Sequence, residues 1–238
     1  MRKGFAILIF LAWIGNCVIA SDPYFKPTTH IGIHGGMNFS TVSFQPRIKE
    51  SFLPSYAYGL VFRHVSEPNI GLQIEVNSWG KGWKELIDST GSYIRKINTI
   101  NVPVMAAFIA GSKSIRFAFT IGPYLSYMRY DKENVELLQK QNFAAVTNRT
   151  MRYNSELIYL TEGLFKRPHY YKPFASNWEF GFTGGVAAEI HTKIGGFAVR
   201  ASYSHALTNL YPLNEEKYYF SASRQQVIHA GVMYFISF

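Results

Sequence analysis

The chain has 238 residues, and its 24 Lys and Arg outnumber its 15 Asp and Glu, giving a formal net charge of +9. Charged residues make up 16% of the chain, against about 25% in a typical soluble domain, whereas Phe and Tyr number 19 and 16. This composition excludes a disordered polymer, and the length suffices for one sizeable domain. A bundle of membrane-spanning helices is also excluded, because beyond residue 20 the longest apolar run, 102–110, has nine residues and contains Pro103.

Residues 1–20 have the features of a secretory signal peptide. Two basic residues precede an apolar stretch at 5–14, and the small residue Ala20 stands where the pattern ends. We expect cleavage after Ala20, which leaves 21–238 as a single mature domain; the alternative is a lipoprotein signal that uses Cys17. Because Cys17 is the single cysteine, the mature chain has no disulfide, no thiolate metal site and no cysteine nucleophile.

Beyond residue 28, apolar residues alternate with small or polar ones, which is the period-two pattern of β-strands. The pattern predicts eight strands, at roughly 29–40, 55–66, 70–81, 93–109, 114–130, 177–191, 195–209 and 225–238. Short connections alternate with long ones along the whole chain. The short connections are 67–69, 110–113 and 192–194, and the long ones are 41–54, 82–92, 131–176 and 210–224. The third long connection could contain a short helix at about 134–141.

This arrangement favours a transmembrane barrel over a soluble sandwich or a lipocalin-like barrel, in which the apolar face would point inward. The fourth and fifth strands have about 17 residues each, longer than the 5–6 usual in globular sheets. Short turns on one side and long loops on the other are typical of outer-membrane barrels, and a closed sheet leaves no backbone group unpaired in hydrocarbon. We therefore predict an all-β fold: an eight-stranded antiparallel transmembrane up-and-down β-barrel. Both termini and the short turns would face the periplasm, and the long loops would be extracellular.

Aromatic residues cluster near the predicted outer ends of the strands, where membrane barrels carry aromatic girdles. The alternative for each of them is ordinary packing in a loop. These residues are Trp79, Trp83, Tyr127, Tyr130, Trp178, Tyr203 and Tyr211.

Several stretches, in this order, resemble the PorT-like outer-membrane barrels of Gram-negative bacteria. They are GIHGGMNFS at 32–40, GLVFR at 59–63, GLQIEVN at 71–77, GWKE at 82–85, NVPV at 101–104 and IGPYL at 121–125. The likeness covers essentially the whole mature chain and implies the same eight-stranded, porin-like fold and an outer-membrane location. The founding member acts in type IX protein secretion, but no secretion-specific motif is found in this chain.

Five charged residues have the parity of the inward face and lie in the periplasmic half of the predicted barrel. They are Arg63, Glu75, Arg116, Glu189 and Arg200. Three guanidinium groups and two carboxylates in a narrow, poorly hydrated space should pair, because unpaired buried charge is costly. An eight-stranded interior is just wide enough for side chains to fill it. The cluster therefore predicts a structural plug and argues against a diffusion pore.

No motif points to catalysis, a metal or a cofactor. A barrel enzyme that modifies lipid A by hydrolysis would need a base, a nucleophile and an orienting acid close together. His205 faces outward near the rim, but its neighbours on the same face are Tyr203 and Leu207. His30 and His34 share a face but lie about 13 Å apart along a strand, too far to share one metal ion. We therefore expect no enzyme, no metal site and no cofactor.

The partners expected from the sequence are outer-membrane lipid, lipopolysaccharide and an extracellular or periplasmic protein. Nucleic acid is not expected, because nothing in the sequence resembles a nucleic-acid recognition module. Cations in the long loops could neutralise lipopolysaccharide phosphates, unless they are simply solvated. They are Lys81, Lys84, Arg149, Arg152, Lys166, Arg167 and Lys172.

The first functional hypothesis is a non-enzymatic barrel that presents its loops, chiefly 131–176, to a protein or glycan. The alternatives are a transport role, as a secretion component or a narrow solute channel, and a lipid A-modifying enzyme that uses His205.

Overall fold

The computed structural model describes residues 25–87, 91–112, 114–137, 173–213 and 221–238. The predicted signal peptide at 1–20 lies outside the described residues. Within the described part of the chain, no helix is long and apolar enough to cross a membrane.

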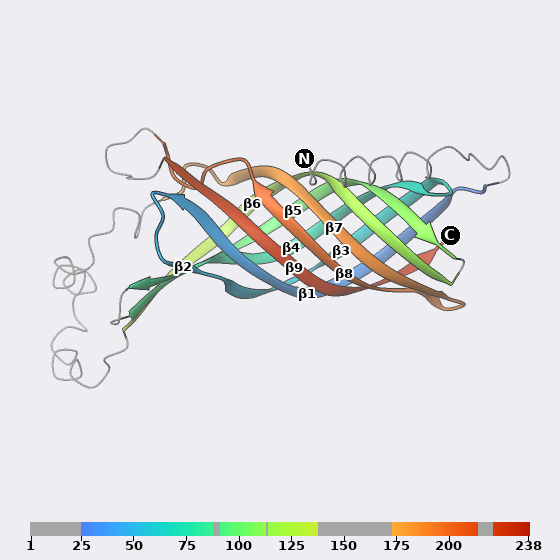
Figure 1. The fold of residues 1–238 in the computed structure, drawn as a ribbon, viewed down its shortest axis with the longest axis horizontal. Helices are drawn as coiled ribbons and strands as arrows, with labels where there is room; N and C mark the ends of the chain where they lie inside the picture. The colour runs from blue at the N-terminus through green and yellow to red at the C-terminus, as the bar shows by residue number, and fades with distance from the viewer. Residues whose placement is uncertain (1–24, 88–90, 113, 138–172, 214–220) are drawn as a thin grey trace, which may run out of the picture.

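Eight long strands and one short strand make up the described structure (Figure 1). They are β1 (Thr28–Gln45), β2 (Glu50–Ser51), β3 (Leu53–Glu67), β4 (Ile70–Ile87), β5 (Gly91–Gly111), β6 (Ile115–Leu137), β7 (Trp178–Thr192), β8 (Gly195–Ala206) and β9 (Ala222–Ser237). The eight long strands and the three short turns lie where the period-two pattern predicts them.

The strands run further than predicted at the end that carries the long connections. β4 and β5 continue through most of the predicted loop at 82–92. The helix predicted at about 134–141 is wrong at its start, because β6 is a strand as far as Leu137. The rest of that segment lies outside the described residues.

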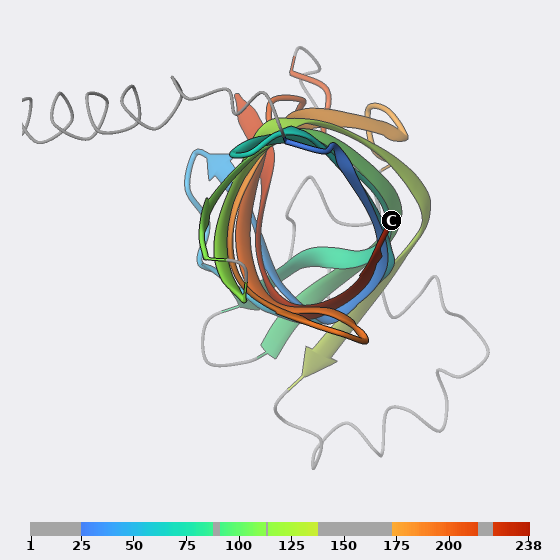
Figure 2. The same cartoon turned by 90° about the vertical axis from the view of Figure 1, so that its right-hand side faces the viewer.

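The eight long strands form a closed antiparallel ring. Each pairs with the next in chain order, and β9 pairs back with β1 from His30 to Gln45. Figure 2 shows this ring end-on. The C-terminal Phe238 completes the closure through two backbone hydrogen bonds to Thr29, with N–O distances of 3.1 and 2.8 Å. Glycine allows the tight turns at one end: Gly111 and Gly195 have φ values of 138° and 139°, which other residues rarely adopt.

The outer wall of the ring is apolar and the inner wall is largely polar. On β6, the outward side chains from Ile115 to Tyr127 are apolar or aromatic. Thr120 and Ser126, on the opposite face of the same strand, are buried inside the ring. Leu60, Phe117 and Val199 are each more than half exposed. Such a band suits hydrocarbon, and the alternative of a soluble barrel with an apolar interior is wrong. The fold is a transmembrane barrel.

The two ends of the barrel differ. We call the end with the short connections the turn end and the opposite end the loop end. The turn end contains the start of β1 and the C-terminus. At the opposite loop end, β4, β5 and β6 project past the other strands (Figure 1). We call residues 80–87, 91–98 and 130–137 the extension; Gly82 pairs with Lys96, which pairs with Lys132.

Candidate functional site: the filled lumen

Two arginines and two carboxylates pair across the turn-end half of the lumen; we call Arg63, Glu75, Glu189 and Arg200 the charge cluster. The Arg63 Nη1 atom lies 2.6 Å from Glu189 Oε1, and Arg200 Nη1 lies 2.7 Å from Glu75 Oε1. Gln73 links the two pairs, because its Oε1 accepts from Arg63 Nε at 2.7 Å and its Nε2 donates to Glu75 Oε1 at 2.5 Å. All four charged side chains are buried, and their formal charges sum to zero.

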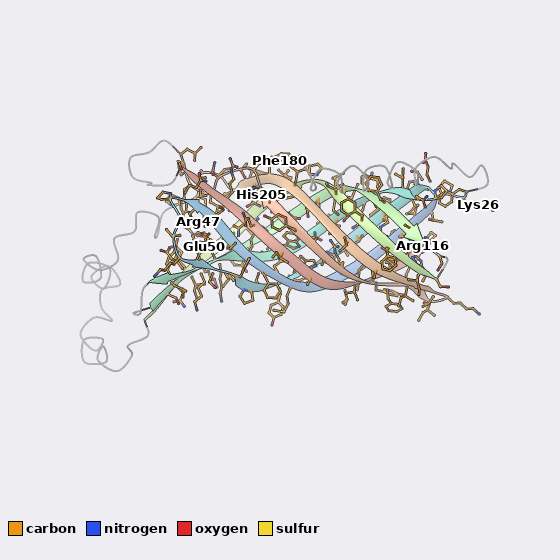
Figure 3. The ribbon with its side chains drawn as sticks, viewed as in Figure 1. Lys26, Arg47, Glu50, Arg116, Phe180 and His205 are labelled. Atoms are coloured by element: carbon orange, nitrogen blue, oxygen red, sulfur yellow. The ribbon has the colours of Figure 1, made fainter. Side chains whose placement is uncertain are left out.

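Arg116, the fifth residue predicted for this cluster, lies apart from it at the turn end of β6 (Figure 3). It is half-buried and makes no ion pair with any residue that the structure describes. Arg116 is opposite Glu189 in the β6–β7 ladder, but Arg63 occupies one oxygen of that carboxylate. The other oxygen lies 3.4 Å from His191 Nε2. Four of the five predicted residues are therefore in contact.

Hydrogen-bonded side chains continue from the charge cluster toward the loop end. Asn77 donates from Nδ2 to Glu75 Oε2 at 3.0 Å, and its Oδ1 lies 2.6 Å from His34 Nε2. Further along, His229 Nδ1 lies 3.0 Å from Asn38 Oδ1. These hydrogen bonds offset part of the cost of removing the side chains from water, although His34 Nδ1 and His229 Nε2 are buried without a hydrogen-bond partner among the described residues.

A second ion pair lies nearer the loop end, between Lys81 Nζ and Glu179 Oε1 at 2.6 Å. The Tyr124 hydroxyl donates to the same carboxylate oxygen at 2.9 Å. Lys81 is buried and cannot act as a rim cation, so the prediction that it neutralises lipopolysaccharide is wrong. Its parity, that of Glu75 and Asn77, turns it inward. Of the other predicted loop cations, Lys84 is described below, and the remainder lie at 149–172, outside the described residues.

An apolar cluster closes the loop end, and we call it the aromatic cap. It consists of Val42, Phe44, Trp83, Tyr93, Ile97, Met128, Leu210 and Tyr211, with Ile48 and Phe174 packed against it. Trp83 and Tyr211 are 0% and 1% exposed, and Trp79 lies deeper in the lumen at 3%. The prediction that these three belong to the outer girdle is wrong, because all face inward. Tyr127, Tyr130, Trp178 and Tyr203 are exposed on the outer wall, as predicted.

Arg95 is enclosed within the cap. Its guanidinium carbon lies 3.9 Å from the centre of the Phe174 ring, and Nη1 donates to the Tyr211 hydroxyl at 2.8 Å. Nη2 lies 2.6 Å from Asp131 Oδ2 and 3.1 Å from Glu133 Oε1. Burial opposes the charged form, but Tyr211 and Glu133 together raise the pKa of Arg95 above its ordinary value. The cap therefore holds a permanent cation that ties β5 to β6.

Little space remains between these side chains. The void beside Arg63, Thr120, Arg200 and Met233 has a volume of about 10 Å³, about the room that one water molecule requires. The charge cluster, the polar side chains and the cap follow one another along the lumen, so the described interior is a packed core.

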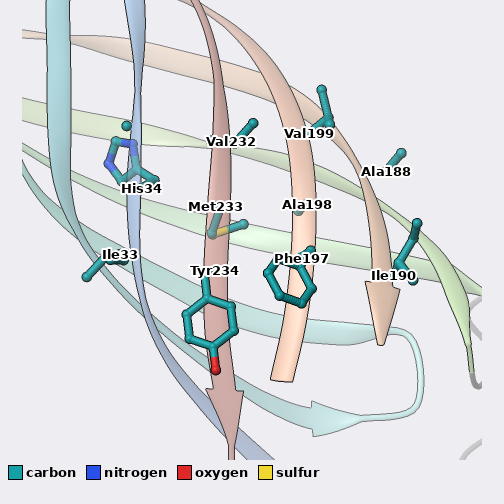
Figure 4. Close-up of a pocket in the computed structure, with 11 residues that line it drawn as sticks. Ile33, His34, Ala188, Ile190, Phe197, Ala198, Val199, Val232, Met233 and Tyr234 are labelled. Atoms are coloured by element: carbon teal, nitrogen blue, oxygen red, sulfur yellow. The ribbon is translucent and has the colours of Figure 1, made fainter. Parts of the chain in front are cut away.

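A hollow with a volume of about 560 Å³ lies on the lipid-facing wall (Figure 4). Apolar side chains such as Ile33, Phe197 and Val232 surround it. Its lining has two titratable rings: the His34 imidazole bonds to Asn77 inside the lumen, and the Tyr234 hydroxyl donates to the Ile194 carbonyl at 2.7 Å. These residues do not supply a base beside a nucleophile, so the hollow is an apolar surface in contact with lipid.

His205 lies on the outer wall of β8 (Figure 3), as its parity predicts. Its ring stacks on Tyr203 with 6.5 Å between centroids, and its partners across the strands are Phe182 and Gln226. None of these neighbours is a carboxylate that could orient the imidazole as in a Ser-His-Asp triad, and none is a serine that could act as the nucleophile. Within the described ranges, no group of three or more His, Asp or Glu side chains could hold a metal ion.

Most residues of the lumen network lie outside the charge cluster that the sequence predicts. His34, Asn77, Lys81 and Glu179 all have inward parity, and this signal could have placed them beside the charge cluster. Arg95 could not be found in this way, because its partners come from a segment that the sequence predicts to be a loop.

A family described as "Outer membrane protein beta-barrel domain" matches residues 24–211, which is most of the chain. The chain belongs to this family, which places it in the outer membrane. The PorT-like subgroup suggested by the sequence stays a prediction. No curated protein matches the chain.

Solved structures with a similar fold include three small outer-membrane barrels. OprG from Pseudomonas aeruginosa is 11% identical, with a TM-score of 0.41, and the match covers 87% of this chain and 95% of OprG. Ail from Yersinia pestis, in complex with the heparin analogue sucrose octasulfate, is 10% identical with a TM-score of 0.40, covering 87% and 99%. Neisserial surface protein A is 8% identical with a TM-score of 0.39, covering 86% and 96%.

Proposed function

We propose that this member of the outer membrane protein β-barrel domain family is a non-enzymatic barrel whose own side chains plug its lumen. Its turn end would face the periplasm, and its loop end, chiefly 131–176, would be presented to a protein or glycan partner outside the cell. The observation that carries the proposal is the succession of buried, paired side chains from the charge cluster to the aromatic cap. A solute in transit would have to separate ion pairs such as Arg63–Glu189, which leaves buried charges without partners.

The conductance of the refolded barrel in planar bilayers tests this proposal. We expect no stepwise conductance above that of the empty bilayer, while a wide porin inserted under the same conditions gives clear steps. Fluorescently labelled protein should be used to verify that the barrel has inserted. Regular conductance steps from the inserted chain, or a protein cargo retained in the periplasm of a deletion strain, would instead favour a transport role.

The absence of catalysis is also a proposal, and the surroundings of His205 support it. If the chain is not an enzyme, the mass of lipid A is the same in a wild-type strain, a deletion strain and a His205→Ala strain. A change in lipid A mass that depends on His205 would contradict this part of the proposal.

We further propose that the outer-membrane form begins after Ala20, because export requires a signal that is then removed. The intact mass of the protein isolated from the outer membrane should correspond to 21–238. A mass that includes a lipid on Cys17 would show the lipoprotein alternative to be correct.

A further inference from the structure

Cations lie on the outward face of the extension and at the adjoining residue Arg129; we call Lys84, Lys96, Arg129 and Lys132 the basic face. Lys96 and Lys132 lie directly opposite each other on β5 and β6. Arg129 is exposed on β6, and Lys84 is half-buried on β4, one outward position beyond Gly82 in the same ladder. Three neighbouring strands therefore contribute to a single positively charged surface.

A β-bulge separates the positive and negative charges of this segment. Thr99 pairs with Met128 but Asn98 pairs with Tyr130, so Arg129 is the extra residue. The bulge shifts the parity of β6, which turns Asp131 and Glu133 inward to Arg95 and leaves Lys132 outside.

Two further carboxylates that the structure describes near the extension also face inward. Glu85 on β4 is fully buried, and Glu50 lies opposite it across the β2–β4 pair, on the same side of the sheet. Among the outward side chains described in the extension, there are cations and no carboxylates. Two like charges directly opposite each other destabilise a strand pair, so an anion bound between Lys96 and Lys132 would relieve their repulsion.

The basic face lies just beyond the apolar band. Arg129 follows the outward aromatic Tyr127 by two positions, and Lys96 is four positions beyond the outward Ile100. A tilted strand gains about 2.5 Å of height per residue, so these cations lie about 5–10 Å past the edge of the hydrocarbon. The headgroup layer adds about 5–8 Å on each side of a bilayer. The height of the cations therefore matches that of lipid headgroups.

Exposed aromatic rings beside the basic face support this placement. The Tyr127 and Trp178 rings lie 4.9 Å apart on the outer wall immediately below Arg129. Lys132 Nζ lies 6.0 Å from the centre of the exposed Tyr130 ring. Tyr and Trp gather where hydrocarbon meets headgroups, so the cations above them face the headgroups themselves.

We propose that the basic face binds the phosphate groups of an anionic outer-leaflet lipid of the lipopolysaccharide class, with Lys96 and Lys132 sharing one phosphate. The inference rests on the proposed orientation, in which the loop end faces the outside of the cell. It does not depend on a closed lumen. The resulting contact would fix the height of the extension at the membrane surface.

Binding of fluorescent lipid A to the folded, full-length barrel in detergent micelles tests the proposal. The probes are bisphosphorylated lipid A and dephosphorylated lipid A with the same acyl chains. We expect Lys96→Gln/Lys132→Gln to weaken binding of the bisphosphorylated probe about 30-fold, because each basic side chain near an anionic lipid surface contributes about fivefold. Lys96→Arg/Lys132→Arg should keep the affinity of the parent.

The matched control is Lys26→Gln/Lys193→Gln, which removes two exposed lysines from the turn end; Lys26 is labelled in Figure 3. This control should bind as the parent does. Equal binding of the two lipid probes, or equal affinity for the parent and Lys96→Gln/Lys132→Gln, would overturn the inference. Displacement of lipid A by millimolar inorganic phosphate would also overturn it, because the face would then be a general phosphate site.

Conductance measured on the same preparations keeps the two proposals separate. A barrel that conducts ions but requires Lys96 and Lys132 to bind lipid A would contradict the proposal of a plugged lumen. The same result would support the proposal that the basic face binds lipid phosphates. A barrel that is closed to ions but binds the bisphosphorylated and dephosphorylated probes equally would contradict only the proposal that the basic face binds lipid phosphates.

Discussion

Glu75 is the residue on which the charge cluster depends most. Its carboxylate receives hydrogen bonds from Arg200, Gln73 and Asn77. Removal of one member of a buried ion pair leaves the other charge uncompensated, which costs more than removal of both. Glu75→Ala should therefore lower the free energy of unfolding by about 3–5 kcal/mol. Glu75→Ala/Arg200→Ala should lose less than the sum of the two single losses.

Urea unfolding in lipid vesicles, followed by tryptophan fluorescence, gives these free energies. Gln226→Ala on the outer wall serves as the control for a polar residue outside the lumen. Strictly additive losses for Glu75 and Arg200 would show that the two side chains are not coupled.

Glu50 makes the pairing of β2 with β4 depend on pH. Burial raises the pKa of Glu50 from its ordinary 4.5 to about 7; Arg47 opposes this shift and Glu85 adds to it. A carboxyl group with a raised folded-state pKa binds its proton more tightly in the folded protein. The contribution of Glu50 to the stability of the β2–β4 pairing is therefore most favourable below about pH 4.5. This contribution is lost as the pH rises to about 7.

Hydrogen exchange at the Leu86 N–H, which donates to the Lys49 carbonyl at 2.9 Å, measures this effect. Its protection factor, corrected for the intrinsic exchange rate, should fall between pH 5 and pH 8. Glu50→Gln should make the factor independent of pH over this range. An identical decline in Glu50→Gln would assign the pH dependence to another group.

At the residue scale, strand parity predicts which side chains enter the lumen, because successive residues of a strand point to opposite faces. It predicts inward positions for Arg63, Glu75, Glu189 and Arg200, and the structure places these side chains in the lumen. Trp79, Trp83 and Lys81 were misplaced because they were assigned by their distance along the strand and not by their face. Which side chains bond to each other could not be predicted, since this requires the register of all eight strands.

At the scale of the strands, the outward positions of the apolar band should tolerate no charge. Leu60 on β3 and Phe119 on β6 are 61% and 46% exposed, in contact with hydrocarbon in the membrane. Leu60→Arg and Phe119→Arg should each destabilise the barrel by about 2–4 kcal/mol. Urea titration of the barrel in lipid vesicles measures the loss.

Ser66→Arg is the matched control, because Ser66 is exposed at the turn end of β3. Near the interface an arginine should cost only about 0–1 kcal/mol. If Phe119→Arg unfolded at the same urea concentration as Ser66→Arg, the assignment of this face to lipid would be wrong.

The extension is the part of the fold that the sequence does not predict. Its outward side chains contact headgroups and water, so residues such as Lys84, Lys96 and Lys132 replace apolar ones and the alternation disappears. The segment at 82–92 therefore looks like a loop, although the paired backbones of β4 and β5 continue through it. The bulge at Arg129 further hides the pattern, because the parity of β6 changes there.

At the scale of the whole molecule, the barrel combines a lipid-facing wall with a packed polar interior and an aromatic cap. The closed ring satisfies the backbone groups within hydrocarbon, and the ion pairs satisfy the charges that the narrow lumen encloses. The eight-stranded outer-membrane barrel implied by the sequence is confirmed. Its partner at 131–176 stays a prediction, because most of that segment lies outside the described residues.

The electrophoretic mobility of the protein with and without boiling shows whether the chain forms a closed membrane barrel. Cells are fractionated, and the outer-membrane fraction is run on a denaturing gel. We expect a band of mature size in that fraction whose unboiled form migrates differently, because a closed barrel resists detergent until it is heated. A band in the soluble periplasmic fraction whose mobility boiling does not change would show that the chain is not a membrane barrel.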